Sequence, residues 1–280
     1  MILIADSGST KTDWCIEENG SIVLRAATQG INPFHQEWDT IATIVNDELL
    51  PQLGEAEIDH VYFYGSGCRE EQVPAMQRLL GRVFTQAGRI EACGDLLAAA
   101  RAVCGKSEGI ACILGTGANS CLYDGQRVVK NTSPLGYILG DEGSGAVMGK
   151  LFVNAAFKGK LPEALRNEFL EESHLTMNEI IRRVYCEPMA NRFLASFAPF
   201  IRHHLSNPLL RKLVVDNFRE LFRRNVEQYG RHDLKVGAIG SVAFYFSAEL
   251  TEAAAAEGFT MDKIMRSPME GLVRFHANSK

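Results

Sequence analysis

The same pattern of hydrophobic and polar positions occurs twice along the chain. Residues 2–6 read as a buried strand, and a Ser-Gly-Ser-Thr-Lys bend leads into a second strand over residues 12–17. Residues 110–115 read as another buried strand, and a Thr-Gly-Ala-Asn bend leads into a strand over residues 120–123. Each pair then continues through Asn-Gly or Asp-Gly, the dipeptides typical of tight hairpins, into a third strand. The pattern therefore predicts two three-stranded antiparallel meanders.

Apolar residues at helical spacing, and shorter apolar runs, predict the remaining elements. The further strands are expected at residues 21–28, 60–64, 89–92, 126–131 and 234–239. The helices are expected at residues 37–50, 71–87, 96–104, 145–157, 161–172, 177–184, 189–205, 209–229, 242–257 and 262–276. The strands at 60–64 and 234–239 both lead into Gly-Ser, so the two halves match again beyond their meanders.

A repeat of this length indicates a duplicated domain rather than a solenoid. At 280 residues the chain also exceeds the usual size of a single domain. We expect α/β lobes over residues 1–107 and 108–280, the second with an extra helical block after residue 150. Two such lobes would face their glycine bends toward one cleft and bind a phosphate chain there. The last helix is expected to pack back on the first lobe.

Composition narrows the classes of function. The formal net charge of −5, without a basic patch, argues against a nucleic-acid partner. No apolar run approaches the roughly 20 residues that a membrane span needs, and Met1 leads directly into a strand without a basic leader. The seven cysteines include no C-x-x-C pair, so we expect reduced structural thiols and a cytoplasmic protein.

The glycine-rich segment from Gly143 to Lys150 resembles a Walker A loop only briefly. Its first glycine would have to stand at Ser144, and Leu151 follows the lysine where the motif needs Ser or Thr. We therefore expect these small residues to open a closely packed helix. No H-E-x-x-H or G-x-S-x-G motif is present either.

Three residues of the first half carry candidate chemistry. Asp6 ends a strand before a bend, so it is either a turn aspartate or an oxygen ligand near Mg²⁺ and phosphate. Lys11 would add a positive charge to the same anion. Asp95 precedes a helix rich in Ala and Leu, so it is either the helix N-cap or a general base that accepts a hydroxyl proton during phosphoryl transfer.

Each of the other polar candidates also has two alternative interpretations. Asp141 either caps the helix that follows or accepts a hydrogen bond from a sugar hydroxyl. Asn32 before Pro33, and Ser66 after a strand, either stabilise turns or bind a polar ligand.

Four segments together resemble a known family. They are Asp6-Ser-Gly-Ser-Thr-Lys-Thr, Leu114-Gly-Thr-Gly-Ala-Asn, Leu135-Gly-Tyr-Ile-Leu-Gly-Asp-Glu-Gly-Ser and Ile239-Gly-Ser. In this order the chain resembles the N-acetylglucosamine kinase branch of the BadF/BadG-type ATPases, within the actin, Hsp70 and sugar-kinase superfamily. The resemblance implies two actin-like, ribonuclease H-like lobes with an ATP and sugar cleft between them.

The resemblance also implies roles for individual residues. Asp95 matches the catalytic aspartate, and Asp6 would lie at Mg²⁺. The residues expected to bind ATP are Gly8, Ser9, Thr10, Lys11, Thr116, Gly240 and Ser241. The residues expected to line the amino-sugar pocket are Asn32, Ser66, Gly117, Gly136, Tyr137 and Asp141. Tyr137 stands where vertebrate-type kinases have tryptophan, and Asp6-Ser-Gly-Ser stands where they have an acidic residue and three glycines.

The implied function is an ATP- and Mg²⁺-dependent kinase of a small amino sugar, N-acetylglucosamine first, acting at the 6-hydroxyl. N-acetylmuramic acid or another hexosamine is the near alternative. An ATPase activator of a radical dehydratase, with Cys93 and Cys112 as the nearest cluster ligands, is the alternative of another class. A non-catalytic actin-like module is the third. The family resemblance further implies a homodimer.

Overall fold

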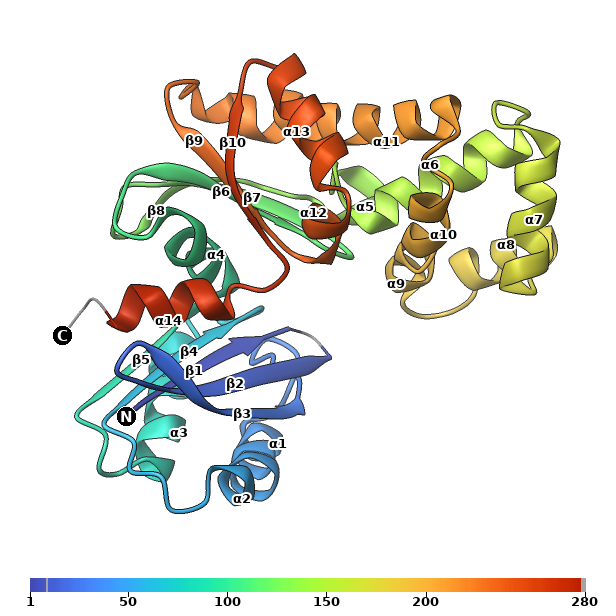
Figure 1. Ribbon diagram of the computed structural model, residues 1–280. Helices are drawn as coiled ribbons and strands as arrows, with labels where there is room; N and C mark the ends of the chain where they lie inside the picture. Colours follow the sequence, from blue (N-terminus) through green and yellow to red (C-terminus); the bar gives the residue numbers. More distant parts are fainter. Residues whose placement is uncertain (9, 278–280) are drawn as a thin grey trace. The chain divides into compact units, whose positions relative to one another are not determined.

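The computed structural model describes residues 1–8 and 10–277 and divides the chain into two compact units (Figure 1). The first unit comprises Met1–Ser107, Gly125–Arg127 and Ser267–Lys280. The second comprises Glu108–Asp124 and Val128–Arg266. Each unit contains one five-stranded mixed sheet with helices packed on it. The predicted α/β fold of two duplicated lobes is confirmed.

The two sheets have the same strand order. The first is ordered β3-β2-β1-β4-β5, and the second, read from the equivalent edge, is ordered β8-β7-β6-β9-β10. In each sheet the first strand of the meander, β1 or β6, lies at the centre. It pairs in antiparallel with the second strand, β2 or β7, and in parallel with β4 or β9 on its other side. The duplication therefore extends to the complete sheet.

The elements of the first unit are β1 (Ile2–Ser7), β2 (Lys11–Glu18), β3 (Ser21–Gln29), α1 (Trp38–Thr43), the π-helix η1 (Ile44–Leu49), α2 (Leu50–Leu53), β4 (His60–Gly65), α3 (Val73–Val83), β5 (Arg89–Gly94), α4 (Asp95–Cys104) and α14 (Met269–Ala277). The sheet is covered on both faces, which explains the unbroken apolar run of β1. Leu3 points into a core with α1 and α3, and Ile4 into a core with α4 and α14.

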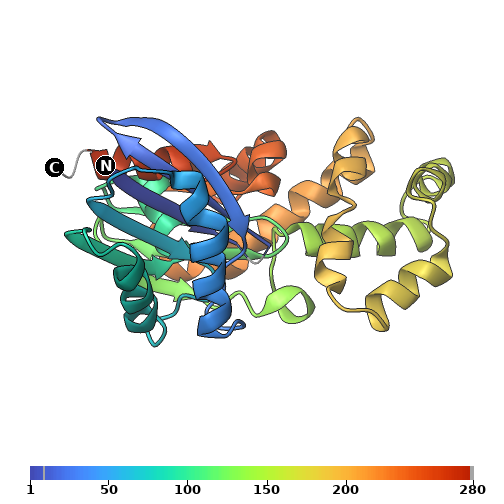
Figure 2. The ribbon, with the colours of Figure 1, turned by 90° about the horizontal axis from the view of Figure 1, so that it is seen from below.

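The elements of the second unit are β6 (Gly109–Leu114), β7 (Ala118–Tyr123), β8 (Val128–Thr132), α5 (Gly136–Leu139), α6 (Gly145–Phe157), α7 (Glu163–Ser173), α8 (Met177–Tyr185), α9 (Ala190–Ala195), α10 (Ala198–His203), α11 (Pro208–Leu221), η2 (Phe222–Val226), η3 (Glu227–Tyr229), β9 (Lys235–Ile239), α12 (Ser241–Tyr245), α13 (Ser247–Ala256) and β10 (Thr260–Met265). One core joins the sheet to these helices. Figures 1 and 2 show α7 to α10 as a block at one end of α6 and α11.

The glycines of α6 are required by packing. A Cβ atom on Gly149 would lie 2.0 Å from the carbonyl oxygen of Leu194, so α6 and α9 meet at backbone distance. Ser144 is the N-cap of α6, and its hydroxyl accepts a hydrogen bond from the Val147 N–H at 3.1 Å. The expectation that this segment opens a packed helix is confirmed.

The predicted helix over residues 262–276 is wrong in its first part. Thr260–Met265 forms β10, which pairs in parallel with β9, and α14 begins only at Met269. Pro268 disfavours helical geometry at the residue before it, so a helix cannot run through it without a break. Two other predicted helices are interrupted: residues 189–205 divide into α9 and α10, and residues 242–257 into α12 and α13.

The seven cysteines are all free thiols, and Cys15, Cys68, Cys112 and Cys121 are buried. Among the described residues no helix is both long and apolar enough to span a bilayer.

Candidate active site

The carboxyl ends of the central strands in the first unit bring aspartates together. Asp6 on β1 lies directly opposite Asp13 on β2 in the antiparallel register. Burial, and to a smaller extent the charges of Asp13 and Asp95, raise the pKa of Asp6 to about 7. Three carboxyl groups therefore share one region at this end of the sheet, an arrangement that a cation would stabilise.

The bend after β1 is closed by its own backbone. The Gly8 N–H donates to the carbonyl of Lys11 at 3.0 Å, and the Gly30 N–H donates to the carbonyl of Thr10 at 3.0 Å. Thr10 is exposed, and the ammonium of Lys11 forms a 2.5 Å ion pair with Asp13. Ser9, predicted to bind nucleotide, lies outside the described residues. Lys11 is thus held beside the aspartates rather than standing alone.

Asp95 is the first residue of α4, and Gly94 occupies the N-cap position. Of the two alternatives for Asp95, the N-cap is therefore wrong by one position. Burial raises the pKa of the Asp95 carboxyl group, while hydrogen bonds from the backbone N–H groups of Leu96 and Asp95 itself lower it. The backbone fixes the direction of this carboxyl group, and desolvation makes it a stronger base than an exposed aspartate.

Asn32 and Ser66 also lie in the first unit. The Asn32 Oδ1 accepts a hydrogen bond from the Phe34 N–H at 3.0 Å, and a Cβ atom on Gly67 would lie only 2.0 Å from it. Ser66 follows β4, its N–H donates to the Ser7 carbonyl at 2.9 Å, and its buried hydroxyl has no hydrogen-bond partner among the described residues. A buried hydroxyl without a partner is an unusual feature that a ligand would satisfy.

In the second unit, the bend after β6 is fixed by the start of α6. The Gly145 N–H donates to the Gly115 carbonyl at 2.8 Å, and the Ala146 N–H donates to the Thr116 carbonyl at 3.1 Å. The Gly115 N–H donates to the Gly117 carbonyl at 2.9 Å, which closes the bend. The Thr116 side chain remains exposed at its tip.

Asp141 lies against this bend. Its Oδ2 is 3.2 Å from the position of a Cβ atom on Gly117, and its carboxyl group accepts a hydrogen bond from the Ala118 N–H. Burial is the largest influence on the Asp141 carboxyl group and raises its pKa. Because Ser144 caps α6, the interpretation of Asp141 as the helix cap is wrong.

Gly136 and Tyr137 form the start of the short helix α5. Gly136 has a positive φ of 74°, which favours glycine. The carbonyl of Tyr137 accepts a hydrogen bond from Lys150 Nζ at 2.8 Å, and its half-buried ring packs against the core of the second unit. The structure thus brings Gly117 and Asp141 into contact, whereas the ring of Tyr137 contributes partly to the core.

Gly240 and Ser241 follow β9. Gly240 has a φ of 114°, and a Cβ atom there would lie 2.2 Å from the Leu114 carbonyl, so only glycine fits. Ser241 is the first residue of α12 and is exposed. This close approach places the start of α12 beside the end of β6.

A pocket of about 560 Å³ joins the bend and the start of α12. Its lining residues are Gly115, Thr116, Arg192, Ala195, Ser196, Ala198, Pro199, Arg202, Ser241, Val242, Tyr245 and Phe246. This volume lies within the range of small-molecule sites. Sequence reasoning found Thr116 and Ser241 but missed the α9–α10 wall, because the segment was expected to be one continuous helix without a site signal.

No group of three or more His, Cys, Asp or Glu side chains forms a metal site among residues 1–8 and 10–277. Mg²⁺ commonly uses only one or two protein carboxylates and completes its shell with water and phosphate oxygens. The crowded carboxyl groups around Asp6 fit such a site. In contrast, Cys93 does not suit a cluster ligand, because burial raises the pKa of its thiol to about 12.

The comparisons with known proteins agree with this geometry. No family model and no curated protein matches the chain. Among solved structures, a candidate N-acetylglucosamine kinase from Porphyromonas gingivalis is 51% identical over 99% of both chains, with a TM-score of 0.94. A second candidate N-acetylglucosamine kinase, from Chromobacterium violaceum, is 16% identical over 98% of both chains, with a TM-score of 0.66.

A third structure extends the likeness of fold. The ROK hexokinase from Thermus thermophilus has a TM-score of 0.56 and 15% identity over 100% of this chain and 99% of its own. The predicted actin-like sugar-kinase fold is confirmed by these matches.

Proposed function

This chain belongs to the N-acetylglucosamine kinase branch of the BadF/BadG-type ATPases, and from that premise we propose that it is an ATP-dependent amino-sugar kinase. The proposed reaction transfers the γ-phosphoryl group of ATP to the 6-hydroxyl of N-acetylglucosamine, giving ADP and the sugar 6-phosphate. The observation that carries the proposal is Asp95, a carboxyl group desolvated and oriented by backbone N–H groups at the start of α4. The 51% identity to the Porphyromonas gingivalis protein supports the choice of sugar.

Asp95 acts as the general base in this proposal. The sugar hydroxyl donates its proton to the Asp95 carboxylate as the oxygen attacks the γ-phosphorus. Only the ionised carboxylate can accept that proton, and its raised pKa makes the transfer more favourable than for an ordinary aspartate. The backbone hydrogen bonds keep the carboxylate in one orientation.

The second unit binds the nucleotide in this proposal. Thr116 and the Gly115–Gly117 bend contact the phosphates, and Ser241 lies near the nucleoside in the pocket of about 560 Å³. Gly240 is required because it brings α12 next to β6. From the first unit, Gly8, Ser9, Thr10 and Lys11 are proposed to contribute further phosphate contacts.

We propose Asp6 as the residue that holds Mg²⁺, through water or directly. When bound, Mg²⁺ neutralises charge that develops on the phosphate oxygens. The crowding of Asp6 by Asp13 and Asp95 favours a cation at this position, because a nearby positive charge relieves the repulsion between the carboxylates.

The proposed sugar contacts come from both units. Asn32 and the hydroxyl of Ser66 are supplied by the first unit, and Gly117, Gly136, Tyr137 and Asp141 by the second. The hydroxyl of Ser66 supports this assignment, since it is buried and has no partner among the described residues. The Asp141 carboxylate is a suitable acceptor for a sugar hydroxyl.

The decisive experiment is ADP release from MgATP with N-acetylglucosamine, N-acetylmuramic acid, N-acetylmannosamine, glucosamine and glucose. Turnover that depends on sugar, with the highest kcat/KM for N-acetylglucosamine, is the expected result. A higher kcat/KM for N-acetylmuramic acid would change the proposed substrate but leave the proposed phosphoryl transfer unchanged. Equal ATP hydrolysis with every sugar and with none would overturn the proposal and favour an ATPase activator.

Three further proposals follow from the family. The functional lobes begin at residues 1 and 108, and the last helix, α14, works with the first lobe, in whose compact unit it lies. The protein works in the cytoplasm, a reducing compartment that suits its seven free thiols. It forms a homodimer, which light scattering coupled to size-exclusion chromatography would test directly.

A further inference from the structure

The pocket of the second unit contains an arginine stacked on a tyrosine. Arg202 on α10 places its guanidinium carbon 4.6 Å from the centre of the Tyr245 ring on α12, and both residues line the pocket. Arg266 contacts the same ring from 5.6 Å but does not line the pocket. The pair therefore joins two separate helices across one wall of the pocket.

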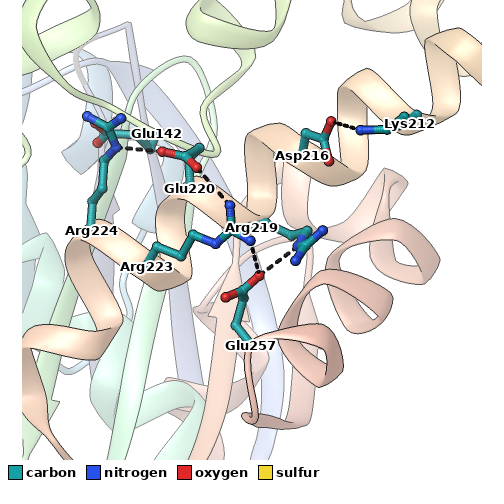
Figure 3. A network of polar contacts seen from close by, with 8 residues as sticks. All are labelled: Glu142, Lys212, Asp216, Arg219, Glu220, Arg223, Arg224 and Glu257. Carbon is teal, nitrogen blue, oxygen red and sulfur yellow. Dashed lines mark hydrogen bonds and ion pairs between the residues drawn. The ribbon is translucent and has the colours of Figure 1, made fainter.

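Arg202 differs from most arginines of this unit because it forms no ion pair with the described residues. Figure 3 shows the usual situation on α11 and η2, where Arg219 and Arg223 bind Glu257 and Arg224 binds Glu220. A guanidinium that is stacked on one face and free of carboxylates keeps its other face and its N–H groups available to a ligand.

The position of the pair separates it from the phosphate bend. A Cβ atom placed on Gly145 would lie 3.2 Å from the Ala195 Cβ and 3.2 Å from the Gly115 carbonyl oxygen. Ala195 is therefore close to the bend and lies at that end of the pocket. Arg202 comes seven residues after Ala195 along α9 and α10. Tyr245 comes one helical turn after Ser241, on the same face of α12 and about 6 Å further along its axis.

We propose that Arg202 and Tyr245 form the stacking platform for the nucleobase and determine a preference for purine over pyrimidine nucleotides. This inference rests on the proposed function, since it assigns the nucleotide to this pocket. With the phosphates at the Gly115–Gly117 bend and the nucleoside near Ser241, the base reaches the end of the pocket where the pair lies.

The surroundings suit a flat aromatic ring. Pro199, Val242 and Phe246 supply apolar walls, while the planar guanidinium offers a face of similar size to a base. Stacking on a purine covers more of this platform than stacking on a pyrimidine. The charge also favours the electron-rich face of the base, because a cation is attracted to an aromatic ring.

The test is equilibrium binding, by isothermal titration calorimetry, of ADP, CDP and inorganic tripolyphosphate to the full chain. Arg202→Ala and Tyr245→Ala should each weaken ADP binding roughly ten-fold or more, with a smaller loss for CDP. Tripolyphosphate should bind within about two-fold of wild type, because it makes no stacking contact. Tyr245→Phe should retain ADP binding, since it keeps the ring, whereas Arg202→Lys should not restore it, because ammonium is not planar.

The matched control is Arg183→Ala. Arg183 is stacked on Phe193 at 4.1 Å in the same helical block, but it does not line this pocket. Its removal should leave the binding of all three probes unchanged. Melting temperatures of the five variants identify any general loss of fold.

Unchanged ADP affinity in Arg202→Ala and Tyr245→Ala would overturn the inference. So would equal losses for ADP and tripolyphosphate, which would make Arg202 a phosphate contact instead. Because the measurement is binding, it is separate from turnover. If ADP binds as expected but no sugar is phosphorylated, the proposed function fails while the platform stands.

Discussion

The two units use one sheet order for different chemistry at the ends of equivalent strands. In the first unit the end of β1 carries Asp6, with Asp13 and Asp95 close enough to raise its pKa. In the second unit the equivalent bend carries Gly115 and Thr116, and its carbonyls are satisfied by the start of α6. The duplicated scaffold thus carries three neighbouring aspartates in the first unit, whereas the second unit has a rigid glycine bend with the single carboxylate of Asp141 against it.

This difference suggests a division of labour. Carboxylates suit a cation and a proton acceptor but repel phosphate, whereas uncharged glycine bends accept phosphate oxygens closely. We therefore expect changes at Asp6 and Asp95 to affect catalysis, and changes at the Gly115–Gly117 bend and at Ser241 to affect nucleotide binding. Four predictions sharpen or break this comparison, from the largest effect to the smallest.

Asp95→Asn should lower kcat for sugar phosphorylation by roughly 100- to 10,000-fold, because the amide cannot accept the hydroxyl proton. The KM for ATP should change little, since none of the residues assigned to the nucleotide is altered. Steady-state kinetics with N-acetylglucosamine measures both. In the wild type, activity should also fall as the pH drops through the pKa of Asp95, which lies above the ordinary aspartate value.

A near-normal kcat in Asp95→Asn would contradict the assignment. The matched control is Asp13→Asn, which changes a neighbouring carboxylate without removing the proposed base.

The glycine that ends β4, Gly65, and the glycine that follows β9, Gly240, should differ in their tolerance to alanine. At Gly240 the new Cβ would lie 2.2 Å from a backbone carbonyl and φ is positive, so Gly240→Ala should cost about 3–5 kcal/mol. At Gly65 the contact is 2.7 Å to the Phe63 ring, a side chain rather than the backbone, so Gly65→Ala should lower the free energy of unfolding by about 1–3 kcal/mol. Urea denaturation compares the two.

Gly230→Ala is the control for backbone strain alone, because φ is 63° and nothing lies within 4 Å of a new Cβ. This substitution should lower the free energy of unfolding by about 1–2 kcal/mol. An equal loss of unfolding free energy in Gly65→Ala and Gly240→Ala would contradict the prediction. It would mean that the close contact between Gly240 and the end of β6 restricts the side chain no more than the contact at Gly65 does.

The raised pKa of Asp6 predicts how stability changes with pH. Its pKa in the folded state, about 7, exceeds the unfolded value. The contribution of Asp6 to the free energy of unfolding is therefore present at pH 4 and is lost as the pH rises through 7. At pH 8 without divalent cation, Asp6→Asn should raise Tm by roughly 2–4 °C, the effect of about 1 kcal/mol. At pH 4 the two proteins should melt alike.

Mg²⁺ should raise the Tm of the wild type at pH 8 and have little effect on Asp6→Asn. Scanning calorimetry with and without MgCl₂ measures this. An equal Mg²⁺ response in both proteins would place the cation elsewhere.

Much of the fold could be predicted from the sequence, because strand alternation and the Asn-Gly and Asp-Gly turns are local signals. Asp95, Thr116 and Ser241 could be selected as candidates because they lie at strand ends or bends, and the structure places Thr116 and Ser241 in one pocket. The strand β10 could not be recognised, because its residues alternate weakly and its pairing with β9 is a long-range contact. Arg202 and Tyr245 were missed because they meet only after α10 and α12 pack together.

The smallest predicted effect concerns the sugar alone. Ser66→Ala should raise the KM for N-acetylglucosamine by about 2- to 12-fold, the equivalent of one hydrogen bond, with the KM for ATP unchanged. Substrate-saturation curves for both substrates measure the change. A larger effect on ATP than on the sugar would place Ser66 near the nucleotide and remove it from the sugar pocket.

The measurement that tests the central claim most directly follows the phosphoryl group itself. The protein is incubated with MgATP and either N-acetylglucosamine or its 6-deoxy analogue, and the products are identified by ³¹P NMR and mass spectrometry. The account predicts N-acetylglucosamine 6-phosphate and an equal amount of ADP with the first sugar, and no phosphorylated product with the second. Phosphate released to water at the same rate in both reactions would contradict it.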